Sequence, residues 1–186
     1  MARLPGRDEL VLRIDSMLED WLGTESGASL GVPGSSGSGS GSSSSASSSG
    51  VGSVPGLDAH HLPEPKPPAV YAIGVVDYAR LAITDPQGIG AAVDEIAWRL
   101  DKLVRSGDVL GIIVPNTFVL ATAAMAPSSA GVVMERITGA FAMPLDIGGE
   151  TVSLRAAIGL AFAFDGASPE SMLAAAERDM QRSLGD

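Results

Sequence analysis

The sequence predicts an α+β fold in which helices pack on one antiparallel β-sheet. Within residues 69–186, apolar strand-like runs and amphipathic helical patterns follow one another in the order β-α-β-β-α-β-β-α. Short turn signals separate neighbouring strand-like runs, which favours hairpins. This order is that of a ferredoxin-like plait with a small accessory hairpin strand. An isolated helical pattern and a segment with almost no apolar residues precede it.

The first half of this domain reads as a strand, a helix and a hairpin. The run "AVYAIGVVDY", from residue 69, predicts a buried strand. Strands over 108–114 and 117–123 flank the turn residues Pro115-Asn116. The segment 86–107 predicts a helix, whose apolar face consists of Ile89, Val93, Ile96, Leu100, Leu103 and Val104.

The second half begins with a helix over "APSSAGVVMERITGAF", with Pro127 at its start. The segment that follows predicts a hairpin turned by Gly148-Gly149, whose second arm is long and apolar. The last helix begins with Ser168 as N-cap and Pro169 at the first helical position.

Residues 1–23 form a separate unit with an amphipathic helical pattern over 6–22. Gly23 is the expected stop, and a lone helix of this length is marginal in water, so its apolar stripe must be buried somewhere. Docking on another protein, on the chain's own domain and on a second copy in a homodimer remain open alternatives. The residues of the stripe, which we expect to bind the partner, are Leu10, Ile14, Met17, Leu18 and Trp21.

Residues 24–68 predict a disordered linker. Its first part is rich in Gly and Ser and its last part in Pro, and neither has enough apolar side chains to form a core. The pair His60-His61 lies in this segment without neighbouring Cys or paired carboxylates. We therefore interpret the two histidines as linker residues and expect no metal site.

Composition excludes several classes of function. A net charge of −10 argues against nucleic-acid binding, which needs a basic face. The chain has no Cys, which suits a reducing compartment, and it begins with no signal-peptide pattern, so we expect a cytoplasmic protein. No apolar run is long enough to cross a bilayer, and the acidic helix face disfavours a membrane surface.

Several motifs, in order and at similar spacing, resemble those of the GGDEF family, the diguanylate cyclases that make cyclic di-GMP from two GTP. The resemblance covers residues 70–185. Phe118 and the "VLA" after it resemble the strand that follows the family's signature. The other matching segments are "ITDPQGIGAAVDEI" (83–96), "AIGLA" (157–161) and "AAAERDMQRSLGD" (174–186).

The residues at the catalytic positions differ from the family pattern. The signature falls on 114–118, where Val114 and Pro115 replace the paired glycines and Asn116 and Thr117 replace the acidic pair that binds Mg²⁺. The family's guanine-binding Asn and Asp fall on Thr84 and Val93. Its basic residues near the first strand fall on Arg80 or Leu81, and Asp77 alone cannot hold two Mg²⁺ ions. The resemblance therefore implies a domain that is not an enzyme and holds no metal or cofactor.

One ligand site survives this comparison. The family often carries R-x-x-D shortly before its signature as a product-inhibition site for cyclic di-GMP, and Arg105 and Asp108 fall in register with it. Arg136 falls near the place of a further Arg of that site. Arginine forks suit guanine edges and phosphates, and Asp can accept from guanine N–H groups. Alternatively, Arg105 only complements a helix C-terminus and Asp108 only closes a turn.

The expected function is a catalytically inactive GGDEF-like regulatory or adaptor module that acts through protein–protein interaction and senses cyclic di-GMP at this site. A purely structural interaction scaffold without nucleotide binding is the alternative, and residual nucleotide cyclase activity is a third. Another enzyme class is disfavoured, because both histidines lie outside the domain and no Ser–His or Cys–His pair is available.

Overall fold

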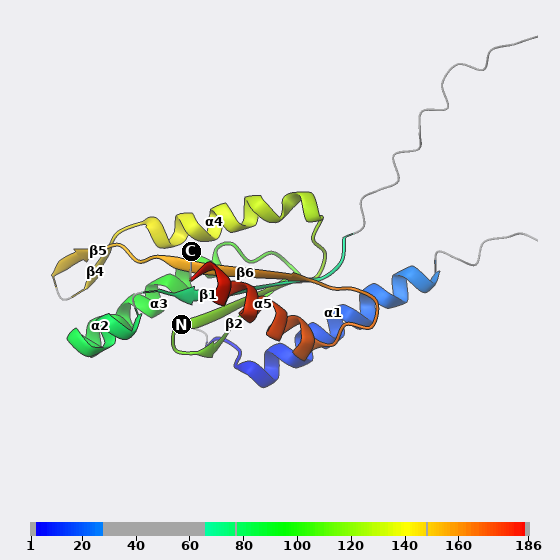
Figure 1. The fold of residues 1–186 in the computed structure, drawn as a ribbon, viewed down its shortest axis with the longest axis horizontal. Helices are drawn as coiled ribbons and strands as arrows, with labels where there is room; N and C mark the ends of the chain where they lie inside the picture. Colours follow the sequence, from blue (N-terminus) through cyan, green and yellow to red (C-terminus); the bar gives the residue numbers. More distant parts are fainter. Residues whose placement is uncertain (1–2, 28–65, 77, 148, 185–186) are drawn as a thin grey trace, which may run out of the picture.

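The computed structural model of this chain describes residues 3–27, 66–76, 78–147 and 149–184. Its main sheet is antiparallel and has the strand order β2-β3-β1-β6, with helices on both faces (Figure 1). The predicted α+β fold is therefore confirmed. The strands of this sheet are β1 (Ala69–Val75), β2 (Val109–Val114), β3 (Thr117–Thr122) and β6 (Ala156–Phe162).

The helices that the structure describes are α1 (Arg7–Gly27), α2 (Tyr78–Thr84), α3 (Pro86–Asp101), α4 (Ala130–Ala142) and α5 (Pro169–Ser183). Local signals fix where two of them begin. Asp85 accepts a hydrogen bond of 2.9 Å from the amide of Gly88 and caps α3. Ser168 accepts one of 3.2 Å from the amide of Ser171, with Pro169 at the start of α5, as predicted.

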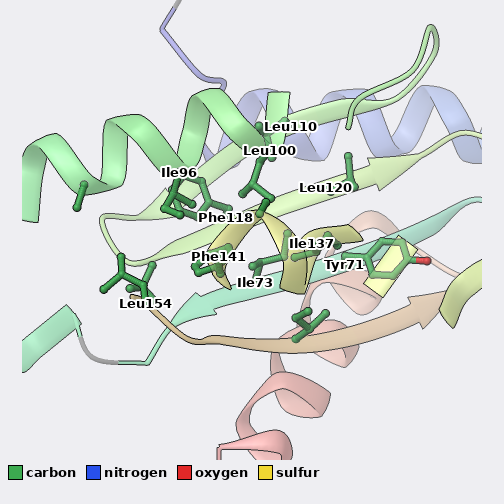
Figure 2. Close-up of a cluster of buried hydrophobic side chains, with 14 of the residues drawn as sticks. Tyr71, Ile73, Ile96, Leu100, Leu110, Phe118, Leu120, Ile137, Phe141 and Leu154 are labelled. Carbon is green, nitrogen blue, oxygen red and sulfur yellow. The ribbon is translucent and has the colours of Figure 1, made fainter. Parts of the chain in front are cut away.

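One face of the sheet packs against α3 and α4. Tyr71 and Ile73 of β1 point to this face, since successive strand residues alternate sides. Figure 2 shows both among side chains of the two helices. Each large apolar side chain that is fully buried there contributes about 1.5–3 kcal/mol to stability. We call this cluster the first core; its fully buried members include Tyr71, Ile73, Ile96, Leu100, Phe118, Ile137 and Phe141.

Arg99 of α3 fixes the C-terminal end of α4. Its guanidinium donates to the carbonyl oxygens of Ala140, Met143 and Pro144 at 2.7–3.1 Å, and to the carboxylate of Glu95 at 2.8 Å. A cation beside the unpaired carbonyls of a helix C-terminus also interacts favourably with the helix dipole. This contact holds α4, and with it Arg136, against α3.

The other face of the sheet packs against α1 and α5, which lie next to each other (Figure 1) and share an ion pair of 3.5 Å between Arg7 and Glu177. Val70 and Ala72 of β1 point to this face. We call this cluster the second core; its buried members are Leu10, Ile14, Met17, Leu18, Val70, Ala72, Val119, Ala121, Ala157, Ala161, Ala163, Met172, Leu173, Ala176 and Met180.

Two glycines make this second layer of helices possible. A Cβ at Gly111 of β2 would lie 2.6 Å from Cδ1 of Leu10, so the missing side chain leaves the space that α1 fills. A Cβ at Gly159 of β6 would overlap the backbone of α5 at Ala176 and Met180. The outer edge of β6 is covered as well, because the carboxylate of Asp179 accepts from the amide of Leu160 at 3.0 Å.

Several sequence expectations need correction. α1 continues to Gly27, past the expected stop at Gly23, because one glycine inside a helix costs only about 1 kcal/mol relative to alanine. The short helix α2 was not predicted, and the helix expected over 86–107 ends at Asp101. The hairpin expected in this region consists of two short strands of a separate sheet, β4 (Leu145–Ile147) and β5 (Glu150–Val152), while the long apolar strand β6 pairs with β1 instead.

The apolar stripe of α1 does not face outward. Leu10 and Ile14 have no exposed surface, Met17 and Leu18 are buried, and Trp21 packs at the margin of the second core. Of the three open alternatives, the structure shows docking on the chain's own domain. The expectation that these five residues bind a separate partner stays a prediction, and it requires α1 to leave the second core, which uses them here.

Most of the expected linker, 28–65 with His60 and His61, lies outside the described residues. Pro67 and Pro68 are described and already belong to the domain, since their carbonyl oxygens accept from the amides of Met125 (3.0 Å) and Ala163 (2.8 Å). Among the described residues, no helix is both long enough and apolar enough to cross a membrane.

Candidate functional site

The segment 105–108 is a tight turn between the end of α3 and β2. The amide of Asp108 donates to the carbonyl oxygen of Arg105 at 3.0 Å, and Gly107 takes a φ of 93°, which a residue without Cβ adopts at little cost. This geometry brings Arg105 and Asp108 to the same side of the chain. We call this turn, together with Ala123 at the end of β3, the hairpin base.

Asp108 organises the hairpin base through its carboxylate. Oδ2 accepts from the backbone amide of Arg105 and Oδ1 from that of Ala123, both at 3.3 Å. These long bonds leave acceptor capacity on both oxygens, because a carboxylate has about four lone-pair directions. The turn-closing role that the sequence left open for Asp108 is thus present in the structure, and it does not consume the whole carboxylate.

Arg105, Asp108 and Arg136 line one hollow of about 150 Å³. Arg136 comes from α4, so two separate parts of the chain contribute its charged side chains. Both arginines are exposed, and no ion pair of either side chain is found in the described part of the chain. We call this the base hollow; its other lining residues are Leu103, Ser106, Leu120, Thr122, Ala123, Ala124, Met125 and Val133.

Tyr71 lies near the base hollow, where the sequence pattern indicated only a buried strand. It pairs with Leu120 across the sheet, is fully buried, and donates its hydroxyl to the carbonyl oxygen of Ala130 at 3.5 Å. Burial, and secondarily the negative charge of Asp108, raises the pKa of Tyr71 from 10.0 to about 12. Tyr71 is thus a fully buried phenol next to the hollow, and it resists ionisation more than an exposed tyrosine does.

The other end of the hairpin, Val114–Thr117, is the hairpin tip. Asn116 uses its backbone carbonyl to accept from the amide of Val75 at 2.9 Å, and the side chain of Thr117 is buried. Among the described residues, no group of three or more His, Cys, Asp or Glu side chains is arranged to hold a metal ion. Asp77 lies outside the described residues.

An apolar groove of about 440 Å³ lies beside the hairpin tip. Val93, at the position of the family's guanine-binding Asp, lines it, together with Asp94 as its one charged side chain. Thr84, at the position of the Asn, uses its hydroxyl inside α2, donating to the carbonyl oxygens of Arg80 and Leu81 at 3.1 and 3.2 Å. The remaining lining residues of this tip groove are Tyr78, Gly90, Ile112, Ile113, Val114 and Pro115.

Solved structures of GGDEF domains have the same fold as this chain. A sensory box/GGDEF family protein from Caulobacter crescentus superposes with a TM-score of 0.71 at 15% identity, over 98% of this chain and 94% of that chain. The chain has a GGDEF-type fold. The GGDEF domain of YfiN (TpbB) from Pseudomonas aeruginosa gives a TM-score of 0.70 at 16% identity, over 100% of this chain and 92% of that chain.

A third GGDEF structure is the GGDEF domain of DgcB from Caulobacter crescentus in complex with c-di-GMP. It gives a TM-score of 0.59 at 15% identity, over 63% of this chain and 72% of that chain. No protein-family model matches the sequence, and no curated protein matches it. At identities this low, the superpositions establish the GGDEF-type fold alone. What this chain binds depends on its own residues.

The structure thus brings together all three residues that the sequence singled out for ligand binding. The features that sequence reasoning missed are Tyr71, the Ala123 amide that Asp108 holds, and the tip groove. The sequence singled out Val93 only by its place in the order of the motifs, and the structure shows that it lines the tip groove. No local signal in the sequence marks Tyr71 or Ala123, because their roles depend on contacts with residues far away in the chain.

Proposed function

We propose that this chain is a regulatory receptor for cyclic di-GMP on a GGDEF-type fold and that it does not make this nucleotide. The observation that carries the proposal is the convergence of Arg105, Asp108 and Arg136 on the base hollow. Two exposed guanidinium groups and a carboxylate around one hollow suit a ligand that carries both phosphates and guanine edges.

The chemistry of each group supports this ligand class. Arg105 and Arg136 can each donate a pair of hydrogen bonds to a phosphate or to the O6/N7 edge of guanine. The unused acceptor capacity of Asp108 suits the N1–H and N2–H donors of the same base. Because the chain carries a net charge of −10, an anionic ligand depends on these local cations against an unfavourable overall field.

The size of the base hollow constrains how a dinucleotide would sit. Small-molecule pockets commonly measure roughly 300–1,000 Å³, so a hollow of about 150 Å³ accepts one base or one phosphate group. The rest of the ligand would lie over the exposed arginines. The complex of DgcB with c-di-GMP supports the proposal to the extent that a protein of this fold holds this ligand.

The residues at the hairpin tip support a non-catalytic role. Phosphoryl transfer from GTP needs divalent cations held by carboxylates close to the phosphates. The tip offers Val114, Pro115, Asn116 and Thr117 instead, and the neighbouring tip groove is apolar. Neutral and apolar side chains at these positions give little electrostatic support to Mg²⁺ or to the charge that develops during the reaction.

Two assays on the full chain test the two halves of the proposal. Titration calorimetry with cyclic di-GMP should give saturable heat in the micromolar range, and Arg178→Ala, which removes an exposed positive charge from α5, should bind equally well. Incubation with GTP and Mg²⁺ should give no cyclic dinucleotide. Absence of heat at high micromolar ligand refutes the receptor, and measurable product refutes the non-catalytic assignment.

A protein-interaction scaffold without nucleotide binding is the second candidate, and the tip groove is the observation that favours it. Its lining is almost entirely apolar, and Val114 is 46% exposed. A scaffold of this kind would keep its function in an Arg105→Ala/Arg136→Ala variant. If calorimetry with cyclic di-GMP gave no heat, the receptor would be refuted and the scaffold would replace it as the proposed function.

A further inference from the structure

The base hollow and α1 lie on opposite sides of the same strand, β3. Val119 and Ala121 of β3 are buried in the second core, to which α1 and α5 both contribute, whereas Leu120 and Thr122 line the base hollow. This division follows from the alternation of side chains along a strand. The two sites are therefore separated by the thickness of one sheet.

Ala123 belongs to both sites. It lines the base hollow, packs against the second core, and donates its amide to Oδ1 of Asp108 at 3.3 Å. Val109, the residue after Asp108, also packs against the second core. The turn that carries Arg105 and Asp108 is thus held from below by side chains that depend on the helices of the second face.

The position of α1 depends on its packing. The 38 residues 28–65 join it to the rest of the domain, so its contacts with the sheet, and not short connectivity, keep it in place. Leu10 and Ile14 are fully buried, and Leu10 fills the space above Gly111. Ahead of the helix, the carbonyl oxygen of Pro5 accepts from the amide of Ile112 at 2.9 Å.

We propose that docking of α1 and binding at the base hollow are thermodynamically linked through Ala123 and Val109. Docked α1 supports the two residues that hold the turn 105–108 in its binding geometry, and release of α1 loosens them. By reciprocity, a ligand at the base hollow favours docked α1, and loss of the ligand favours exposure of the second face of the sheet. The ligand in this linkage rests on the proposed function, whereas the mechanical coupling between the two sites does not.

The first experiment needs no ligand. Hydrogen–deuterium exchange is measured on the full chain, as wild type and as Leu10→Ala/Ile14→Ala. The double variant truncates two buried side chains of α1 and changes no residue of the sheet. Leu12→Ala is the matched control, because Leu12 is on the same helix and 69% exposed. Gly111→Ala is an independent second variant that expels Leu10 from the opposite side.

The expected result is faster exchange in α1 and, with it, about tenfold faster exchange of the amides of Asp108 and Ala123 in both destabilised variants. Amides of the first core, such as those of Ile73 and Ile137, should stay protected and show that the sheet and α4 remain folded. Fast exchange in α1 with unchanged exchange at Ala123 would overturn the linkage, whatever the ligand.

The second experiment adds cyclic di-GMP. The affinity measured by calorimetry should fall about tenfold in Leu10→Ala/Ile14→Ala and stay unchanged in Leu12→Ala, a size typical of coupling between sites. Equal affinity in all three proteins would overturn the linkage and leave the receptor intact. Failure of the wild type to bind would refute the receptor, and the exchange experiment would still decide the linkage.

Discussion

The two ends of the β2–β3 hairpin differ in chemistry although they share the same two strands. The hairpin base carries Arg105 and Asp108, which together with Arg136 of α4 line a hollow of about 150 Å³. The hairpin tip, where the family resemblance places the catalytic signature, carries Val114, Pro115, Asn116 and Thr117 beside an apolar groove. Secondary structure alone thus does not distinguish the two ends, and the side chains at each end determine what it can bind.

The difference is understandable from what each end must do for the fold. The tip needs only to turn the chain, and the backbone carbonyl of Asn116 already ties it to β1 through the amide of Val75. Its exposed side chains, Val114 and Pro115, are therefore free to vary without loss of the sheet. The base must close the turn after α3, and Asp108 does so with two backbone hydrogen bonds, so the same residue serves the fold and the proposed ligand.

The largest expected effect is on ligand binding at the base. Arg105→Ala/Arg136→Ala should weaken cyclic di-GMP binding at least about 100-fold, because each lost charge-assisted hydrogen bond costs roughly 1.5–3 kcal/mol. Arg105→Lys keeps the charge but loses the fork geometry and should weaken binding about tenfold. Calorimetry measures both; full affinity in the double variant would place the ligand elsewhere.

A second prediction concerns the stability of the fold at alkaline pH, which depends on the burial of Tyr71. Tyr71 has a pKa of about 12 in the folded state, against 10.0 for an exposed tyrosine. Between pH 10 and 12 the unfolded chain loses this proton while the folded chain keeps it, so stability falls as pH rises, by roughly 2–3 kcal/mol in total.

Denaturant unfolding between pH 9 and 11.5 measures this effect, and Tyr71→Phe should remove that part of the pH dependence. The hydroxyl makes one long hydrogen bond of 3.5 Å, so the phenylalanine variant should remain folded. Identical pH profiles for the two proteins would contradict the assignment of a buried phenol.

A smaller effect is expected from Asp108→Asn. The amide keeps one oxygen acceptor but loses the charge, and its two backbone bonds are long, so the free energy of unfolding should fall by about 1 kcal/mol. The pKa of Tyr71 should fall slightly as well, because Asp108 is the lesser cause of its rise. Asp94→Asn in the tip groove is the matched control and should change neither quantity.

The smallest effect is expected at the hairpin tip. Asn116→Ala keeps the backbone carbonyl that bonds to Val75, and Val114→Ala shortens a side chain that is 46% exposed. Each should change stability by no more than about 0.5 kcal/mol and leave cyclic di-GMP binding unchanged. A loss of binding in either variant would mean that the tip, and not the base, holds the ligand.

Local signals predicted a large part of the fold. Ser168 with Pro169 marks the start of α5, and Pro115-Asn116 marks the turn of the hairpin, because these residues act on their own backbone. The sequence also singled out Arg105, Asp108 and Arg136, which the structure places around one hollow, and their role in ligand binding stays a prediction.

The features that were missed depend on contacts between distant segments. The separation of β6 from the short β4–β5 hairpin is one such feature, since β6 pairs with β1, as in the predicted plait, and is not the second arm of that hairpin. The apolar stripe of α1 indicates that it packs against something, yet only the space above Gly111 shows that its own sheet receives it. Tyr71 gave no signal because its surroundings come from β3, α4 and the turn at Asp108.

The most direct test of the contrast between base and tip is an NMR titration of the full chain with cyclic di-GMP, following every backbone amide. Saturable shifts should gather at 105–109, 123–125 and around Arg136, with the amides of 114–117 nearly unchanged. Shifts that gather at the hairpin tip, or no saturable shift at high micromolar ligand, would contradict the account.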